Sequence, residues 1–406
     1  MLSRALRIVI VNGPRQSGKT TLLRLFRDTH GGSLRSLDEP LTLAPALNDP
    51  IEFARQGEQP IIIDEVQRGG DPLVLAIKYL VDQSNDPGQY VLAGSTRFLT
   101  IPTLSESLAG RAAFVDLWPF AGVELAGITT DTVAIMVNSP RELLAAGSSP
   151  WSRADYLDLI CTGGYPEAIR IPAGPGRWGW FEGYLQTVIQ RDVRQFADIK
   201  QGTLIPRLLS LLVARTGSPA ILADLARTVG LNHITTRNYL SYLDIVFLTM
   251  RVPAWSTSLT TKTAKTAKTY VTDTGIAAYL MGVDAEALRQ TGHPSLGPLV
   301  ETLVATELTK LLAHQDRGVA LHYFRDRDGR EIDFILETRD GRIIGIEVKA
   351  TSSVTRKDFR HLAWLRDKLG DRFTAGIVFH LGAESYSFGD RLQAVPVSAL
   401  WEHAIW

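Results

Sequence analysis

The chain has 406 residues, no net formal charge and a single cysteine, Cys161. The length predicts two or three domains, and 45% hydrophobic with 21% charged residues is typical of a globular protein. One cysteine excludes an internal disulfide framework and favours a reducing cytoplasm. The sequence has no run of about 18 apolar residues, so we expect no membrane span. We expect no secretory signal either, because the N-terminal apolar run leads straight into a glycine-containing loop.

The first predicted elements are a strand, a loop and a helix. Ile-Val-Ile-Val at residues 8–11 predicts a buried strand, and residues 21–26 predict a helix. The loop between them reads G-x-x-x-x-G-K-T. Its glycines let the backbone wrap a phosphate chain, and its N–H groups with the helix N-terminus attract the negative charge. We therefore predict an ATP site, in which Lys19 binds the β- and γ-phosphates and Thr20 binds Mg²⁺. The nucleotide-binding residues would be Gly13, Pro14, Arg15, Gln16, Ser17, Gly18, Lys19, Thr20 and Thr21.

A second apolar strand, Ile61–Ile63, ends in the carboxylates Asp64 and Glu65. A fully apolar run is typical of a central strand in a parallel sheet. About fifty residues after a phosphate loop, such a pair predicts a metal-binding aspartate and a catalytic glutamate. Asp64 would hold Mg²⁺, and Glu65 would activate the attacking water.

The region up to residue 148 alternates strands and helices, which predicts a doubly wound α/β sheet. We expect its strands at residues 7–12, 34–38, 60–64, 90–94 and 114–118. The fourth ends in Gly94-Ser95-Thr96. Ser95 is a candidate sensor of the γ-phosphate beside the strand that carries Asp64; an ordinary strand-end turn is the alternative.

Together with Ser105–Arg111 (S-E-S-L-A-G-R), these segments resemble the AAA ATPases. The likeness is closest to a bacterial and archaeal branch with a G-P-R-x-x-G-K-T loop. The resemblance implies that Arg111 is an arginine finger, which reaches the γ-phosphate of a neighbouring subunit. A guanidinium stays charged and can neutralise the transferred phosphoryl group. A finger acting in trans implies a homo-oligomeric ring, with a hexamer favoured. The alternative role for Arg111 is a surface ion pair.

Residues 149–290 predict a mostly helical domain with a winged helix. Residues 221–229 and a second helix from residue 233 would form a helix-turn-helix, and residues 246–252 with 269–272 would form the strands of a wing. This third of the chain is the basic one, with 15 basic and 11 acidic residues between 151 and 289. DNA contact is one prediction, and a lid or oligomer contact is the other. The candidate DNA-contacting residues are Thr236, Arg237, Lys262, Lys265 and Lys268.

Two further segments of this region, residues 163–168 (G-G-Y-P-E-A) and 268–275 (K-T-Y-V-T-D-T-G), resemble a domain of unassigned role that follows the ATPase core in the same branch. They predict architecture rather than chemistry.

Residues 291–406 predict a helix followed by strands. Glu347 and Lys349 are two apart, so they share one face of a strand, and Asp333 and Glu301 can converge on them. This set resembles the PD-(D/E)-x-K nuclease fold, a restriction-endonuclease-like α/β domain. Carboxylates of this kind hold Mg²⁺, which activates water, and Lys349 would supply positive charge. Such folds also serve as docking modules that cut nothing, so cleavage stays open.

The sequence as a whole predicts a Mg²⁺-dependent ATPase with an AAA core, a winged-helix domain and a nuclease-like domain. Its partner would be DNA, which it would move, remodel or cleave; branched DNA is one candidate. The alternative is a nucleotide-switched regulatory or interaction protein whose C-terminal fold binds a partner without cleaving it.

Overall fold

The computed structural model describes residues 6–95, 108, 110–144, 147–193, 204–256, 266–313 and 318–402. The chain divides into two compact units, residues 1–119 with 245–247, and residues 120–244 with 248–406. Within the described residues no helix is long and apolar enough to cross a lipid bilayer.

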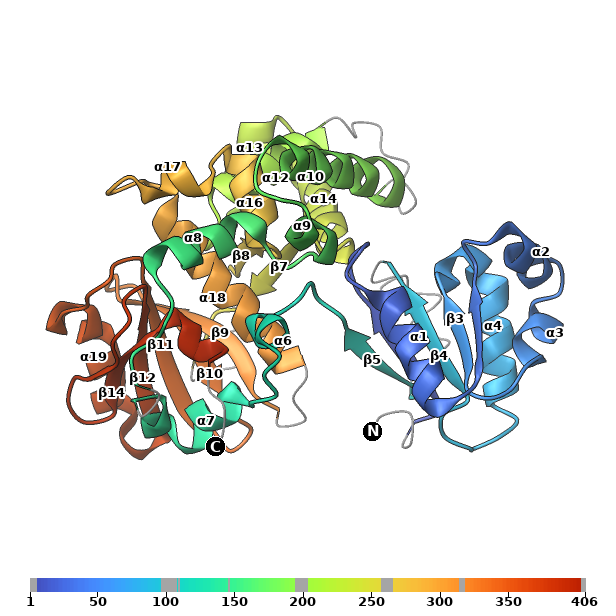
Figure 1. The fold of residues 1–406 in the computed structure, drawn as a ribbon, viewed down its shortest axis with the longest axis horizontal. Coiled ribbons are helices and arrows are strands. Elements are labelled where there is room, and N and C mark those ends of the chain that lie inside the picture. Colours follow the sequence, from blue (N-terminus) through green and yellow to red (C-terminus); the bar gives the residue numbers. More distant parts are fainter. Residues whose placement is uncertain are drawn as a thin grey trace. The chain divides into compact units, whose positions relative to one another are not determined.

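The first unit is built on a five-stranded sheet in the order β2-β3-β4-β1-β5 (Figure 1). All neighbouring strands run parallel. The strands are β1 (Ile8–Asn12), β2 (Ser33–Ser36), β3 (Ile61–Asp64), β4 (Tyr90–Gly94) and β5 (Ala112–Asp116). The parallel α/β sheet expected for this region is thus present, with its strands close to the expected positions.

Helices cover both faces of this sheet and bury alternate residues of its strands. On one face, Leu23 of α1 (Lys19–His30) packs with Val11 and Ile62. On the other, Ile77 of α4 (Gly70–Val81) packs with Ile10. The remaining helices of the unit are α2 (Pro40–Asn48), α3 (Pro50–Arg55) and the 3₁₀ turn η2 (Val66–Gly69). Because the strands are parallel, the loops after β1, β3 and β4 all leave the same edge of the sheet, where open α/β sheets bind ligands.

The second unit begins with helices. They are α6 (Gly122–Ala126), α7 (Thr132–Asn138), η4 (Pro140–Leu144), α8 (Arg153–Thr162), α9 (Pro166–Arg170), α10 (Pro175–Thr187), the π-helical turn η5 (Val188–Asp192), α12 (Leu204–Ala214), α13 (Leu222–Val229), α14 (His233–Ile245), α16 (Thr274–Met281) and α17 (Ala285–Arg289). Both helices of the expected helix-turn-helix are present. Gly230 ends α13 in the left-handed region, at φ 78°, where a residue with a side chain would be strained.

A small antiparallel sheet, β6-β8-β7, accompanies the helix pair α13 and α14. Its strands are β6 (Ser218–Pro219), β7 (Thr249–Val252) and β8 (Lys268–Val271). β7 and β8 are the pair expected for a wing.

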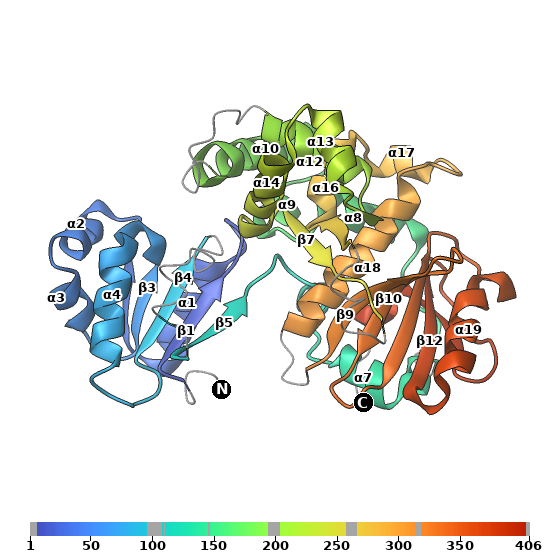
Figure 2. The same ribbon diagram turned by 180° about the vertical axis from the view of Figure 1, so that it is seen from behind.

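The rest of the second unit is a mixed sheet in the order β13-β14-β12-β11-β10-β9. β9 (Ala320–Arg325), β10 (Glu331–Glu337) and β11 (Ile343–Lys349) are antiparallel neighbours, whereas β12 (Phe373–His380) runs parallel to β11 and β14. Helices α18 (Leu296–Ala313) and α19 (Arg360–Leu369) lie on the two sides of the sheet (Figure 2). The remaining elements are η6 (Arg356–Phe359), η7 (Gly370–Arg372), β13 (Tyr386–Ser387), β14 (Leu392–Pro396) and η8 (Val397–Leu400).

Candidate functional site

The loop between β1 and α1 has the backbone that its glycines predict. Gln16 and Gly18 both have positive φ, at 60° and 98°. Lys19 is buried, and its Nζ donates to the carbonyl oxygens of Gly13 and Pro14 at 2.9 and 2.7 Å. The side chain therefore lies along the loop, with its charge held at the loop backbone.

Thr20 and Asp64, the two residues expected to bind Mg²⁺, meet at this edge of the sheet. The Thr20 hydroxyl donates to Asp64 Oδ2 at 2.6 Å, and the Glu65 backbone N–H donates to Asp64 Oδ1 at 3.0 Å. Asp64 is only 2% exposed. A buried carboxylate beside a hydroxyl provides the hard oxygen atoms that Mg²⁺ prefers.

A residue that the sequence analysis missed, Gln67, connects the catalytic and sensor candidates. Its Nε2 donates to a carboxylate oxygen of Glu65 and, at 3.1 Å, to Ser95 Oγ. The side chains of Glu65 and Ser95, which follow neighbouring strands, are thus joined through one amide. Glu65 has φ 53°, in the left-handed region, which is uncommon for a residue with a side chain. Gln67 lies two residues after the acidic pair, but no motif in the sequence indicates that its side chain contacts Glu65 and Ser95.

Unsatisfied polar atoms at the same edge fit a nucleotide. Ser17 Oγ in the loop, Asn12 Oδ1 at the end of β1 and Gln67 Oε1 are buried without a hydrogen-bond partner within the described residues. Buried polar atoms normally find partners, so unpaired ones that gather beside a phosphate loop fit a bound nucleotide there. The loop also cannot take a larger residue at Gly13, where an added Cβ would lie 2.3 Å from the Leu117 carbonyl oxygen.

Arg111 is part of an ion pair within its own subunit. Its guanidinium donates from Nε and Nη2 to the two carboxylate oxygens of Asp82, at 2.5 and 3.0 Å. It directly precedes β5, and its carbonyl accepts from the N–H of Ile8 at the start of β1. Arg111 therefore lies at the amino edge of the sheet, whereas the phosphate loop leaves the carboxyl edge. Most of the S-E-S-L-A-G-R segment before it lies outside the described residues.

Two of the four nuclease-like residues, Glu301 and Asp333, lie with Glu331 around the ammonium group of Lys268. Lys268 of β8 is 1% exposed, and its Nζ lies 3.0 Å from Glu301 Oε1, 2.9 Å from Glu331 Oε1 and 3.9 Å from Asp333 Oδ1. Tyr270 also donates to Glu301 Oε1, at 2.6 Å. The ammonium thus occupies the centre of these carboxylates. No group of three or more potential metal ligands is found in the described parts of the chain.

The other two members of the set form a pair beside this cluster. Lys349 Nζ lies 3.0 Å from Glu347 Oε2, so the two share a face of β11 as expected. Asp333 Oδ2 accepts from the backbone N–H of Val348 at 2.9 Å, which fixes β10 to β11 at this point.

Burial governs the charge state of the cluster. Burial, followed by the charge of Asp333, raises the pKa of Glu301 to about 7 and that of Glu347 to about 8, although Lys268 and Lys349 oppose the shift. Burial alone would lower the pKa of Lys268, but the charges of Glu301 and Asp333 outweigh it and raise that pKa. The lysine therefore stays positive, whereas Glu301 and Glu347 keep a proton more readily than exposed glutamates do.

The structure corrects two of the five candidate DNA contacts. Lys268 is buried against carboxylates and so does not present its charge on a wing. Thr236 is fully buried, and its hydroxyl donates to the Asn232 carbonyl, so it cannot face a base. Arg237 is exposed on α14. Lys262 and Lys265 lie outside the described residues.

Three family models match the chain. An AAA domain matches residues 6–126, and two domains of unknown function, DUF8612 and DUF4143, match residues 153–287 and 296–400. The three matched segments fall within the three domains expected from the sequence.

Two mycobacterial proteins are similar over nearly the whole chain. The uncharacterised proteins of Mycobacterium tuberculosis and Mycobacterium bovis are each 30% identical over 397 residues, which is 97% of this chain and 80% of theirs. The chain belongs to their family. Its first segment is an AAA-type P-loop domain, a class that hydrolyses ATP.

Solved structures match only loosely. A signal transduction ATPase with a tetratricopeptide repeat sensor from Pyrococcus horikoshii is 14% identical, with 75% of this chain and 43% of that one covered and a TM-score of 0.24. PCH-2 of C. elegans is 17% identical, with 59% and 61% covered and a TM-score of 0.18. This chain therefore spans less than half the length of the first and less than two thirds of the second.

Proposed function

We propose that the AAA domain of this protein is a Mg²⁺-dependent ATP hydrolase. The observation that carries the proposal is the hydrogen bond between Thr20 and Asp64, because it joins the phosphate loop to the carboxylate after β3 at the edge where unpaired polar atoms gather. Mg²⁺ at this site would supply positive charge that offsets the charge of the phosphates. Thr20 and Asp64 would hold it, and Lys19 would bind the β- and γ-phosphates.

Glu65 is the residue for water activation. Its carboxylate lies after Asp64 on the same strand end, and Gln67 holds it near Ser95. A carboxylate oriented in this way can accept a proton from a water molecule that attacks the γ-phosphate. Ser95 would sense that phosphate, and Arg111 of a neighbouring subunit would complete the site in a ring.

The test compares binding with turnover. Lys19→Ala should abolish nucleotide binding, and Glu65→Gln should bind ATP but not hydrolyse it, since only the second change leaves the phosphate contacts intact. Binding is measured with a fluorescent nucleotide, and turnover is measured as steady-state phosphate release. Arg24→Ala, which removes a positive charge exposed elsewhere on α1, is the matched control. Wild-type turnover in either site variant would refute the assignment.

We propose that ATP hydrolysis controls how the second unit binds a partner, and that the second unit does not cleave this partner. Lys268 favours this over a nuclease, because its ammonium lies among the carboxylates that a nuclease would use for metal. Action on DNA is the second candidate, and it is supported by the helix pair α13 and α14. Comparing ATPase rates with duplex, single-stranded and branched DNA tests it.

Removing the lysine tests the non-cleaving module. Lys268→Ala should give the protein a Mn²⁺ site that wild type lacks, because three carboxylates lose their cation at once. Mn²⁺ titration by electron paramagnetic resonance, in a Lys19→Ala background that silences the nucleotide site, measures it. Adding Asp333→Asn should remove the new site, and exposed Lys357→Ala is the control. Mn²⁺ binding to this cluster in the wild-type protein would contradict the proposal and would favour a metal-dependent nuclease instead.

A further inference from the structure

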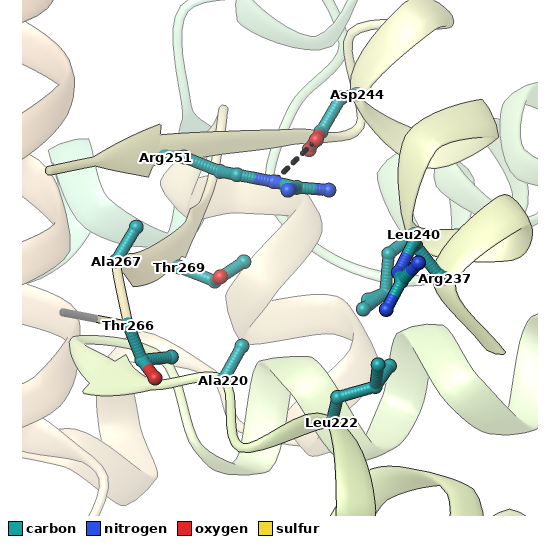
Figure 3. Close-up of a pocket in the computed structure, with 9 residues that line it drawn as sticks. All are labelled: Ala220, Leu222, Arg237, Leu240, Asp244, Arg251, Thr266, Ala267 and Thr269. Carbon is teal, nitrogen blue, oxygen red and sulfur yellow. Dashed lines mark ion pairs between the residues drawn. The ribbon is translucent and has the colours of Figure 1, made fainter. Parts of the chain in front are cut away.

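A pocket of about 200 Å³ opens between the helix α14 and the small sheet of the second unit (Figure 3). Its walls come from α13, α14, β7, β8 and the chain on either side of them. The residues that line it are Ala220, Leu222, Arg237, Leu240, Asp244, Arg251, Thr266, Ala267 and Thr269. β8 separates this pocket from the carboxylate cluster, because Thr269 lines the pocket while its neighbours Lys268 and Tyr270 contact Glu301.

Two arginines give the pocket its charge. Arg251 donates from Nε to Asp244 Oδ2 at 2.6 Å, and Thr249 donates to the other oxygen of that carboxylate at 2.6 Å. Asp244 therefore holds the Nε side of the Arg251 guanidinium and also accepts from Thr249. The Arg237 side chain has no hydrogen bond or ion pair to any residue in the described part of the chain. Figure 3 shows its guanidinium on the wall facing that of Arg251.

The lining therefore carries one net positive charge, from two arginines and one aspartate. A guanidinium has five N–H donors in a planar fork that matches the oxygens of a phosphate, and one end of the Arg251 fork is already immobilised. Leu222 and Leu240 supply an apolar wall beside these donors, and the Thr269 hydroxyl is close by. This combination recognises an anionic group attached to an apolar body.

We propose that this pocket binds a phosphate ester, with Arg237 as the principal ligand and Arg251 as the second. The volume of the pocket suits a phosphate with a small organic substituent rather than a nucleoside triphosphate. One net charge is too little to follow a nucleic-acid backbone over several phosphates, which favours a small phosphorylated molecule as its source. The site does not depend on ATP hydrolysis by the first unit.

The experiment uses the full chain with Lys19→Ala, so that phosphate cannot bind at the nucleotide loop. Phenyl phosphate is titrated by calorimetry into this protein, into its Arg237→Ala derivative and into its Arg227→Ala derivative. Arg227 is an exposed arginine on α13 that is paired with Asp224, so it matches the charge change outside the pocket. We expect Arg237→Ala to weaken binding about tenfold or more, as for loss of a hydrogen bond to a charged group. Arg227→Ala should leave the affinity unchanged.

A second titration identifies the source of the phosphate. If the ligand is a small molecule, a short DNA duplex should leave the affinity for phenyl phosphate unchanged. If the duplex displaces phenyl phosphate, the pocket binds a backbone phosphate of DNA, and the proposal of a small-molecule ligand is wrong. The phosphate site itself is overturned if phenyl phosphate does not bind at millimolar concentration, or if Arg237→Ala binds it as tightly as the parent.

Discussion

At the scale of single residues, the nucleotide site depends on side chains that the loop motif does not contain. Gln67 is the clearest case, because one amide nitrogen holds both Glu65 and Ser95. Glu65 is followed by a 3₁₀ turn, η2, and its own left-handed backbone turns its side chain toward Gln67. Gln67 therefore holds Glu65 in place and, under the proposed function, acts as a positioning residue for it.

Gln67→Ala should lower kcat about tenfold while changing the nucleotide Kd less than twofold, since it releases Glu65 without touching the phosphate contacts. The size follows from losing one orienting contact of a general base, whose whole contribution is about a hundredfold or more. Gln56→Ala is the control, because Gln56 also donates an amide hydrogen bond to a glutamate, Glu52, but directly follows α3. An equal loss of binding and turnover would assign Gln67 to nucleotide contact instead.

At the scale of elements, Asp273 ties together two turns that are more than a hundred residues apart in sequence. It caps α16 by accepting from Ile276 N at 3.0 Å, and it accepts from Gly164 N at 2.7 Å. The approach is so close that a Cβ on Gly163 would lie 2.2 Å from Asp273 Oδ1. Gly275 is equally confined, with an added Cβ 2.6 Å from the Thr162 carbonyl. The two family-like segments are therefore the two halves of one packing contact.

Asp273→Ala should lower the stability of the second unit by about 3 kcal/mol, because it leaves two buried N–H groups unpaired and removes a helix cap. Denaturant unfolding followed by tryptophan fluorescence measures it. Asp284→Ala is matched, since Asp284 caps α17 through Ala287 N at 2.8 Å on the surface, and it should cost only about 1 kcal/mol. Equal effects of the two changes would mean that the contact with Gly164 contributes nothing.

At the scale of the whole molecule, the position of Arg111 bears on assembly. Arg111 lies at the amino edge of the sheet and is paired with Asp82, so it is held away from the phosphate loop of its own subunit. The hydrogen bond from Arg111 lowers the pKa of the Asp82 carboxyl, and burial, a weaker effect, opposes this shift. The pair therefore stays ionised at neutral pH, and a finger acting in trans would have to leave Asp82.

Mixing two inactive variants tests that role. Arg111→Ala and Lys19→Ala should each lose ATPase activity, yet a mixture should regain part of it, because some interfaces would combine an intact loop with an intact arginine. Phosphate release across mixing ratios, with subunit exchange checked by light scattering, is the measurement. Full activity of Arg111→Ala alone would show that the arginine serves only its ion pair with Asp82.

Much of the first unit could be predicted because its information is local. The apolar runs before Gly13 and Asp64 are each one strand long, and the loop glycines are needed by backbone geometry whatever surrounds them. The helix pair 222–245 was equally predictable, since Gly230 can end a helix without strain. Contacts such as that between Gln67 and Ser95 were not, because neighbouring strands in a parallel sheet are joined by long crossovers that sequence spacing does not reveal.

By itself, then, the sequence determined the phosphate loop, the acidic strand end, the order of the elements and the acidic and basic residues of the second unit. The tertiary structure alone decided how those charges are used. Lys268 looked like a surface cation in a basic loop, but strand alternation turns it toward Glu301 while Thr269 lines the pocket with Arg237. The reason is physical: a charge acquires its role from what is packed within a few ångströms of it, and those neighbours come from α18 and β10, which are distant in the chain.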